Sequence, residues 1–96
     1  MRYRIELAQN AKDDYLGFDA RWRSVIKSGL DTYLSHEPMK ESKSRIKRLR
    51  DLSHPQYRLR IEEIRIFYDV VDDLVTVVAI VLKKEAEAWL SRYGEK

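Results

Sequence analysis

Three arginines occupy alternate positions in two neighbouring segments of this 96-residue chain. Arg58 and Arg60 lie in residues 57–61, and Arg65 lies in residues 64–68, just beyond an acidic pair. Polar and apolar residues alternate through these segments, which is typical of β-strands with two distinct faces. If the acidic pair forms a two-residue loop, Arg60 lies directly opposite Arg65, and all three arginines share one face of a hairpin.

This grouping of arginines brings like charges together. Like charges directly opposite each other destabilise a pair of strands, so the pattern favours a face that receives phosphate groups. The alternative is that the arginines extend into water or pair with carboxylates elsewhere, as long side chains can do at little cost. A basic block in residues 40–60 and the pair Lys83-Lys84 support the first interpretation. The further basic residues expected to contact the bound polyanion are Lys47, Arg48, Arg50 and Lys83.

The acidic pair Glu62-Glu63 is an unusual choice for a tight hairpin loop. Such loops need φ > 0 and usually contain Asn or Gly. A longer loop or a bulge would shift the pairing and move Arg65 out of alignment. Arg58 and Arg60 would still share one face.

The composition indicates one domain, residues 1–96, with a net charge of +3 and a pI near 9.2. The absence of cysteine excludes disulfides, thiolate metal sites and a cysteine nucleophile. Two histidines far apart in the sequence do not indicate a metal site, and we expect no metal and no cofactor. No run approaches the ~20 apolar residues of a membrane helix, and the N-terminus lacks the apolar segment of a signal peptide. We therefore expect a soluble, cytoplasmic protein.

The N-terminal third of the chain predicts a strand followed by two helices. Residues 2–7 alternate in polarity, and Asn10 is a good N-cap for a helix that begins at the next residue. Residues 11–35 have helical spacing, with a break near Gly17. Asp19 is placed to cap the second helix.

The rest of the chain predicts strands and a closing helix. Residues 45–52 indicate an edge strand or an irregular extended segment, and the apolar run 74–82 suits a central strand buried on both faces. Residues 84–93 predict a helix anchored by Trp89 and ended by Gly94. The order β-α-α-β-β-β(-β)-α predicts a two-layer α+β fold, with the N-terminal helix pair packed on a mainly antiparallel sheet.

The segment RLRDLSHPQYRLRIEEIRIFYDVVDD, followed by an apolar strand and KKEAEAWL, resembles the RelE/ParE superfamily of bacterial toxins. The element order and the length also agree, so the resemblance covers nearly the whole chain. It implies the toxin of a type II toxin–antitoxin system, neutralised by a cognate antitoxin. The RelE-like branch cleaves mRNA in the ribosomal A site, without a metal and with the 2′-hydroxyl as nucleophile. The ParE-like branch inhibits DNA gyrase, which is the alternative target.

The resemblance also implies roles for individual residues. Arg65 matches the arginine that stabilises the scissile phosphate in the RNA-cleaving branch. Arg58 and Arg60 match two basic positions, often lysines, on the preceding strand. Lys84 falls where that branch has an arginine, and it shares the sheet face of Arg65 if Asp72-Asp73 is a regular two-residue loop. These four basic residues are the expected catalytic set.

RNA cleavage through the 2′-hydroxyl also needs a base and an acid. Arginine stays protonated in proteins, so the general base is missing from positions 58 and 60. Leu90 stands where the RNA-cleaving branch has a C-terminal tyrosine. The candidates that remain are His54, Glu85, Glu62 and Glu63. Each also has a structural interpretation: turn residues for His54, Glu62 and Glu63, and a helix-dipole partner for Glu85.

Two classes of function follow from these observations. The first is a ribosome-dependent mRNA endonuclease, and the second is a binding protein that inhibits gyrase or only pairs with an antitoxin. We expect Arg65 to point outward, so that Arg65→Ala abolishes toxicity without unfolding the protein. We also expect an antitoxin helix to cover apolar surface and block the basic face.

Overall fold

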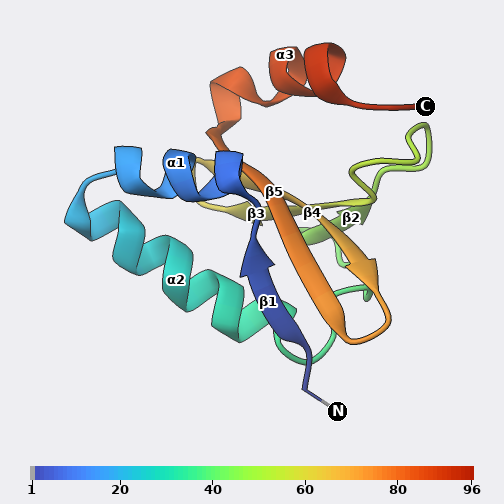
Figure 1. Cartoon of the computed structure of the whole chain (residues 1–96), viewed down its shortest axis with the longest axis horizontal. Helices are drawn as coiled ribbons and strands as arrows, with labels where there is room; N and C mark the ends of the chain where they lie inside the picture. The colour runs from blue at the N-terminus through green and yellow to red at the C-terminus, as the bar shows by residue number, and fades with distance from the viewer. Residues whose placement is uncertain (1) are drawn as a thin grey trace.

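The computed structural model describes residues 2–96 as an α+β fold (Figure 1). Its elements are β1 (Arg4–Leu7), α1 (Gln9–Gly17), α2 (Ala20–Leu34), β2 (Ile46–Arg48), β3 (Tyr57–Ile61), β4 (Ile64–Val71), β5 (Leu74–Leu82) and α3 (Lys83–Tyr93). This order confirms the fold class and the sequence of elements predicted above. None of the helices in residues 2–96 is long and apolar enough to cross a membrane.

The five strands form one sheet in the order β1-β5-β4-β3-β2. β1 pairs with β5 in parallel, and the other neighbours are antiparallel. The predicted central strand, β5, lies between β1 and β4, which explains its nearly continuous apolar sequence. The basic segment before the hairpin supplies the short edge strand β2.

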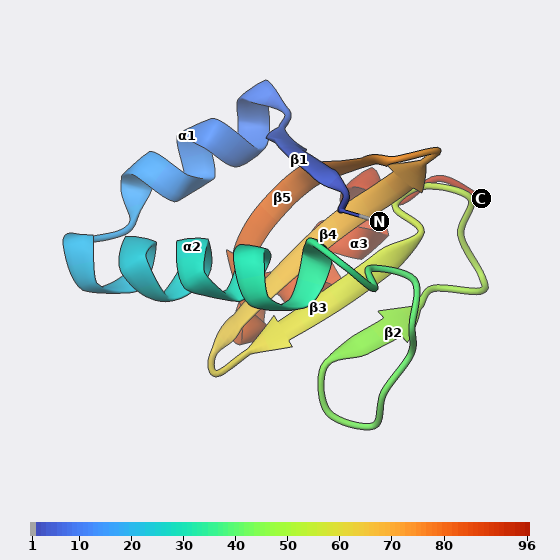
Figure 2. The same ribbon diagram turned by 90° about the horizontal axis from the view of Figure 1, so that it is seen from below.

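Helices α1 and α2 cover one face of the sheet, on the near side in Figure 2. The core beneath them contains the fully buried side chains of Ile26, Leu34, Leu59, Ile66 and Tyr68. The Tyr68 hydroxyl donates a hydrogen bond to the Pro38 carbonyl at 2.6 Å. Burial raises the pKa of Tyr68 far above that of a solvated phenol, so this hydroxyl stays protonated in the core.

The helix starts confirm one predicted cap and correct the other. The Asp19 carboxylate accepts a hydrogen bond from the Trp22 amide at 3.0 Å and caps α2, as predicted. The prediction for Asn10 was wrong, because α1 begins at Gln9 and its N-cap is Ala8. The Ala8 amide donates to the Val77 carbonyl of β5 at 2.9 Å, so the chain enters the helix directly from the strand ladder.

Helix α3 packs on the opposite face of the sheet, behind the strands in Figure 2. Trp89 stacks on Phe67 of β4, with ring centroids 4.9 Å apart and planes inclined by 8°. Gly94 ends the helix, as predicted. Helix α3 therefore covers the part of the arginine-bearing face around Phe67.

Candidate phosphate-binding site

The pairing of β3 with β4 places the three arginines as the alternation predicted. Arg60 pairs with Arg65, and Arg58 pairs with Phe67. On the other side of β3, Lys47 of β2 pairs with Arg58. Directly paired residues share a sheet face with Cβ atoms about 5 Å apart. Lys47, Arg58, Arg60 and Arg65 therefore lie on the face that also receives α3, and we call these four residues the basic cluster.

The hairpin turn that aligns the cluster is the predicted two-residue loop, since Ile61 pairs with Ile64. Glu62 adopts a positive φ of 52°, which residues other than glycine rarely accept. The second acidic loop has the same form, with Val71 paired to Leu74 and Asp72 at a φ of 54°.

The cluster arginines have no carboxylate partner among residues 2–96. The ion pairs of this region join Arg2 to Asp31, Arg4 to Asp73, Lys40 to Glu37, Arg50 to Glu41 and His54 to Asp69. None of them includes Arg58, Arg60 or Arg65. The Arg58 Nε is buried and has no hydrogen-bond partner in the protein. The interpretation in which carboxylates neutralise these arginines is therefore wrong.

Electrostatic repulsion within the cluster shows in the arginine pKa values. Burial lowers the pKa of Arg58, and the charge of Arg60 lowers it further. Burial also lowers the pKa of Arg65, as do Arg60 and Arg58, and Glu63 offsets part of this effect. A bound anion would relieve this repulsion, because an opposite charge nearby favours the charged form of each group.

Arg65 is not the outward side chain that we expected. It is only 5% exposed. Its Nη1 folds back over the turn and donates to the carbonyls of Glu62 at 2.8 Å and Ile64 at 2.9 Å. Arg60 is exposed and Arg58 is partly buried, so these two guanidinium groups present more surface to a ligand.

Lys83 and Lys84, which follow β5, lie near the basic cluster. Lys84 does not share the sheet face of Arg65, which a regular alternation along β5 had predicted. A bulge opposite Phe67 and Tyr68 shifts the register of β5 and places Arg65 opposite Val81. The strand then ends at Leu82, and both Lys83 and Lys84 belong to the first turn of α3. The Lys83 amide donates to the Glu63 carbonyl at 2.7 Å, so the hairpin turn and the helix start are in direct contact.

The other basic candidates are engaged elsewhere. The Arg48 guanidinium lies 5.1 Å from the ring centroid of Tyr57 and donates to the Gln56 carbonyl at 2.9 Å. Arg50 forms an ion pair with Glu41, with 2.6 Å between nitrogen and oxygen. Of the three residues in and just after β2 that were predicted to contact the polyanion, Lys47 belongs to the basic cluster, and Arg48 and Arg50 do not.

The structure separates His54 from the arginine pair. His54 Nδ1 pairs with the Asp69 carboxylate, and Asp69 follows Arg65 by four residues on β4. At a rise of ~3.3 Å per residue, that is about 13 Å along the strand. His54 and Arg65 therefore do not reach the same phosphate. No sequence signal marked Asp69 as the residue that holds His54.

Two of the candidate acid–base carboxylates belong to the hairpin turn and to the start of α3. Glu63 influences the pKa of Arg65, and Glu85 lies in the first turn of α3. Glu85 also lies near α1, because it helps raise the pKa of Asp14, although burial is the largest cause of that shift.

Residues 2–96 contain no cluster of three or more His, Asp or Glu side chains suited to a metal ion.

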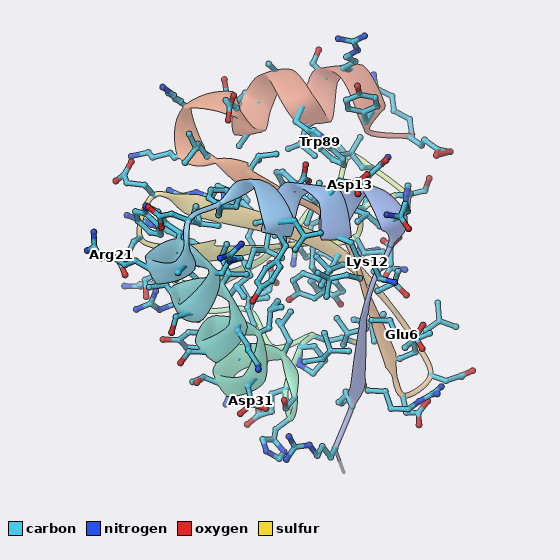
Figure 3. The ribbon with its side chains drawn as sticks, turned by 60° about the vertical axis from the view of Figure 1, so that its left-hand side comes forward. Glu6, Lys12, Asp13, Arg21, Asp31 and Trp89 are labelled. Carbon is cyan, nitrogen blue, oxygen red and sulfur yellow. The ribbon has the colours of Figure 1, made fainter. Side chains whose placement is uncertain are left out.

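A cavity beside the C-terminal part of α3 has the opposite electrostatic character to the basic cluster. It has a volume of about 560 Å³ and is lined by Asp13, Asp14 and Glu95 together with Trp89 and Tyr93. Asp13 of α1 and Trp89 of α3 are labelled in Figure 3. Its carboxylates would repel phosphate.

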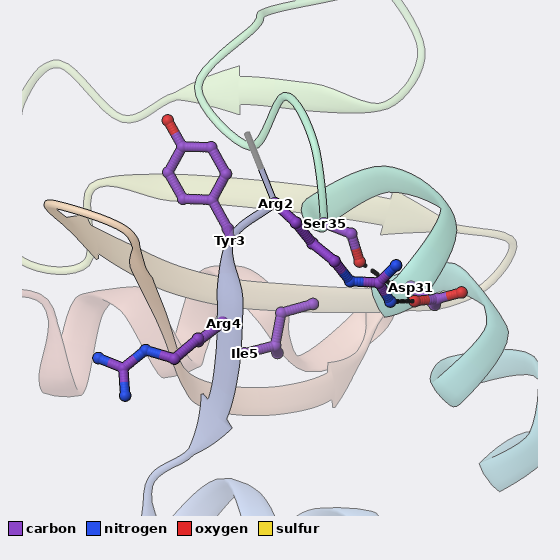
Figure 4. Close-up of a pocket in the computed structure, with 6 residues that line it drawn as sticks. All are labelled: Arg2, Tyr3, Arg4, Ile5, Asp31 and Ser35. Carbon is purple, nitrogen blue, oxygen red and sulfur yellow. Dashed lines mark hydrogen bonds and ion pairs between the residues drawn. The ribbon is translucent and has the colours of Figure 1, made fainter.

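Another cavity lies beside β1, and it also does not suit an anion. It is lined by Arg2, Tyr3, Arg4, Ile5, Asp31 and Ser35 (Figure 4). Arg2 donates to Asp31 at 3.0 Å, and Arg4 lies 3.7 Å from Asp73. Both positive charges are therefore paired, whereas Arg58 and Arg60 of the basic cluster have no carboxylate partner among residues 2–96.

Comparison with solved structures identifies proteins of the same fold. The RelBE2 toxin–antitoxin complex of Mycobacterium tuberculosis aligns with a TM-score of 0.70 at 19% identity, covering 85% of this chain and 99% of that one. The RelE–RelB complex of Pyrococcus horikoshii gives 0.69 at 19% identity, covering 86% and 97%. The RelB–RelE complex of Methanococcus jannaschii gives 0.65 at 19% identity, covering 86% and 95%. No protein-family model and no curated protein sequence matches the chain. The chain thus has the fold of RelE toxins.

Proposed function

We propose that this chain is the toxin of a toxin–antitoxin pair and an mRNA endonuclease that acts on messages in the ribosome. The observation that carries the proposal is the group of three arginines, Arg58, Arg60 and Arg65, on one sheet face without a carboxylate partner in residues 2–96. Guanidinium groups bind phosphate through planar, charge-assisted hydrogen bonds. A polynucleotide backbone can supply several phosphates to such a cluster.

The cleavage that such a site supports is an internal transesterification. The 2′-oxygen attacks the neighbouring phosphorus, the bond to the 5′-oxygen breaks, and the products are a 2′,3′-cyclic phosphate and a free 5′-hydroxyl. The exposed Arg60 and the partly buried Arg58 neutralise the extra charge of the pentavalent phosphate, where preorganised donors have their largest effect. The candidates to take the 2′-proton and to protonate the leaving oxygen are Glu63, whose charge influences Arg65, and Glu85 in the first turn of α3, which follows the turn contact of Lys83.

The proposed partners are a cognate antitoxin, the ribosome and its mRNA, and the proposed location is the cytoplasm. Two of the solved structures that the chain resembles are complexes of a RelE toxin with a RelB antitoxin. An antitoxin that neutralises this chain would supply acidic side chains to the basic cluster or cover the approach to it. The fold similarity and the unpaired arginines support this arrangement.

One observation favours a second candidate, a toxin that binds DNA gyrase without cleaving RNA. Arginine, which stays protonated, stands at positions 58 and 60, and His54 is paired with Asp69 about 13 Å along the strand from Arg65. The only acid–base groups proposed for cleavage are therefore carboxylates. A binding protein needs none.

RNA-end mapping in a translating extract tests the proposal and separates the two candidates. We expect wild-type protein to cut translated messages at codon-phased positions and to leave 5′-hydroxyl ends. Arg60→Ala should lose most of this cleavage, whereas Arg2→Ala, which removes the same charge from a paired site, should retain it. Intact messages together with gyrase-dependent double-strand DNA breaks would overturn the endonuclease and support the second candidate.

A further inference from the structure

Arg65 is almost fully buried and already donates hydrogen bonds to the backbone of its own turn. It is 5% exposed, and its Nη1 donates to the Glu62 and Ile64 carbonyls at 2.8 and 2.9 Å. A guanidinium in this position has little surface left for a phosphate oxygen. Arg60, directly opposite on β3, is exposed. Arg60 can therefore reach a bound phosphate, whereas Arg65 has little surface with which to do so.

The backbone that Arg65 holds is the β3–β4 turn, which has an unfavourable conformation. Glu62 has a φ of 52°, in the left-handed region where a side chain crowds the backbone. The sequence provides no Asn or Gly at this position to accept that conformation at low cost. A charged donor that bonds the carbonyls on both sides of Glu63 compensates by fixing the turn.

The same turn fixes the start of α3. The Lys83 amide, one of the N-terminal helix donors that lack a partner within the helix, donates to the Glu63 carbonyl at 2.7 Å. The first turn of α3 carries Lys83, Lys84 and Glu85. Arg65 and the Lys83 amide therefore bind three consecutive carbonyls of the turn, so the backbone of the turn connects Arg65 to the start of α3.

We propose that Arg65 is a positioning residue that fixes the turn and the start of α3, and that Arg58 and Arg60 are the arginines that contact phosphate. The proposal rests on the proposed function for the identity of the ligand. It differs from the role that the family resemblance implies for Arg65, in which that arginine contacts the scissile phosphate itself. Arg58 suits the contacting role better than Arg65 because its side chain is only partly buried and forms none of the ion pairs found in residues 2–96.

Binding and cleavage of one RNA oligonucleotide by matched variants test this division of roles. Arg60→Ala should weaken RNA affinity about tenfold, the equivalent of one charge-assisted contact, and Arg60→Lys should recover most of it. Arg65→Lys keeps the charge but loses the planar fork. We expect Arg65→Lys and Arg65→Ala to leave affinity close to wild type and to slow cleavage about 100-fold, the size expected for a misplaced catalytic group.

A second substitution tests whether Arg65 acts through the turn. Glu62→Gly removes the side chain that disfavours positive φ, so Glu62→Gly combined with Arg65→Ala should cleave faster than Arg65→Ala alone. Hydrogen exchange of the Lys83 amide provides a readout independent of RNA. We expect faster exchange in Arg65→Ala and slower exchange again in the double variant.

Two results would overturn the positioning role. One is a tenfold loss of affinity in Arg65→Ala that Arg65→Lys restores. The other is a Lys83 amide whose exchange does not change when Arg65 is removed. A wild-type protein that binds no RNA would instead refute the proposed function, and the exchange measurement would still decide whether Arg65 fixes the turn.

Discussion

The two faces of the sheet share strands β3, β4 and β5 but are stabilised by different interactions. Along β3, Leu59 and Ile61 point into the core beneath α1 and α2, whereas Arg58 and Arg60 point to the side of α3. The first face is continuous apolar packing around fully buried side chains. The second combines a small aromatic contact, Phe67 on Trp89, with positive charges that have no acidic partner in residues 2–96.

This difference indicates where stability and function lie. Apolar burial contributes most of the favourable free energy of folding, and the face beneath the helix pair provides most of it. Opposed arginines reduce stability unless an anion binds. A fold that keeps such a pair on one face and a dense core on the other tolerates the repulsion because the core supplies the stability.

The largest expected effect on stability comes from substituting adjacent residues of β3 whose side chains lie on opposite faces of the sheet. Leu59→Ala removes a side chain with no exposed surface and should lower the free energy of unfolding by about 2–5 kcal/mol. Arg60→Ala should change it by no more than about 0.5 kcal/mol, because the side chain is exposed and its loss relieves repulsion with Arg65. Urea unfolding of both variants checks the contrast. Equal losses would contradict the division between the two faces.

A smaller effect on stability is expected from adding a methyl group where α2 packs against the sheet. A Cβ added at Gly29 would fall 2.0 Å from the Ile61 Cδ1, so an alanine fits only if the buried Ile61 side chain changes its rotamer, and Gly29→Ala should destabilise the protein by about 1 kcal/mol. Gly17 provides the matched control, since a Cβ there meets nothing within 4 Å. Gly17→Ala should be neutral or stabilising by up to about 1 kcal/mol. Thermal unfolding of the two variants measures the difference.

The smallest expected effect is on the pH dependence of stability, and it concerns Asp14, at the junction of α1 and β5. Its carboxylate accepts a hydrogen bond from the Ile80 amide at 3.0 Å, and burial together with Asp13 and Glu85 raises its pKa. A raised folded-state pKa means that folding favours the protonated form, so wild-type stability relative to Asp14→Asn increases as pH falls through that pKa. Asparagine can accept the same hydrogen bond without a charge.

Urea unfolding of Asp14→Asn and wild type at pH 7 and pH 4 tests this sign. We expect the variant to gain relative to wild type at pH 7 and to lose that advantage at pH 4. The difference should stay below about 1 kcal/mol, because the carboxylate remains partly solvated. An advantage that grows as the pH falls would contradict the inferred direction.

The parts of the fold that alternate in polarity could be predicted from the sequence. Residues 57–61 and 64–68 alternate, which indicated the strands and the shared face of Arg58 and Arg60. The pairing of Arg60 with Arg65 was predicted only for a two-residue loop, which the structure has. The run 74–82 is almost wholly apolar, so no alternation marks the bulge at Val78, where Ala79 pairs with Phe67 and Val77 with Tyr68. The predicted face of Lys84 was wrong for that reason.

The candidate site could be predicted only in part. Alternation placed Arg58, Arg60 and Arg65 on one face, but it carries no information on backbone hydrogen bonds. The burial of Arg65 against the turn carbonyls and the contact of Glu63 with the start of α3 were therefore not predictable. Trp89 was identified as an anchor of α3, but its spacing did not specify which sheet face it would cover.

The salt dependence of RNA binding tests the central claim, that the unpaired arginines receive phosphate. The measurement compares wild type with the double variant Arg58→Ala/Arg60→Ala and with Arg2→Ala/Arg4→Ala, which removes the same charge from paired sites. The logarithm of the binding constant falls with log salt by ~0.7 per phosphate contacted on a single strand, so the first variant should flatten the slope by about 1.4. The second should leave it unchanged. Equal slopes in all three proteins, or equal flattening in both variants, would contradict the claim.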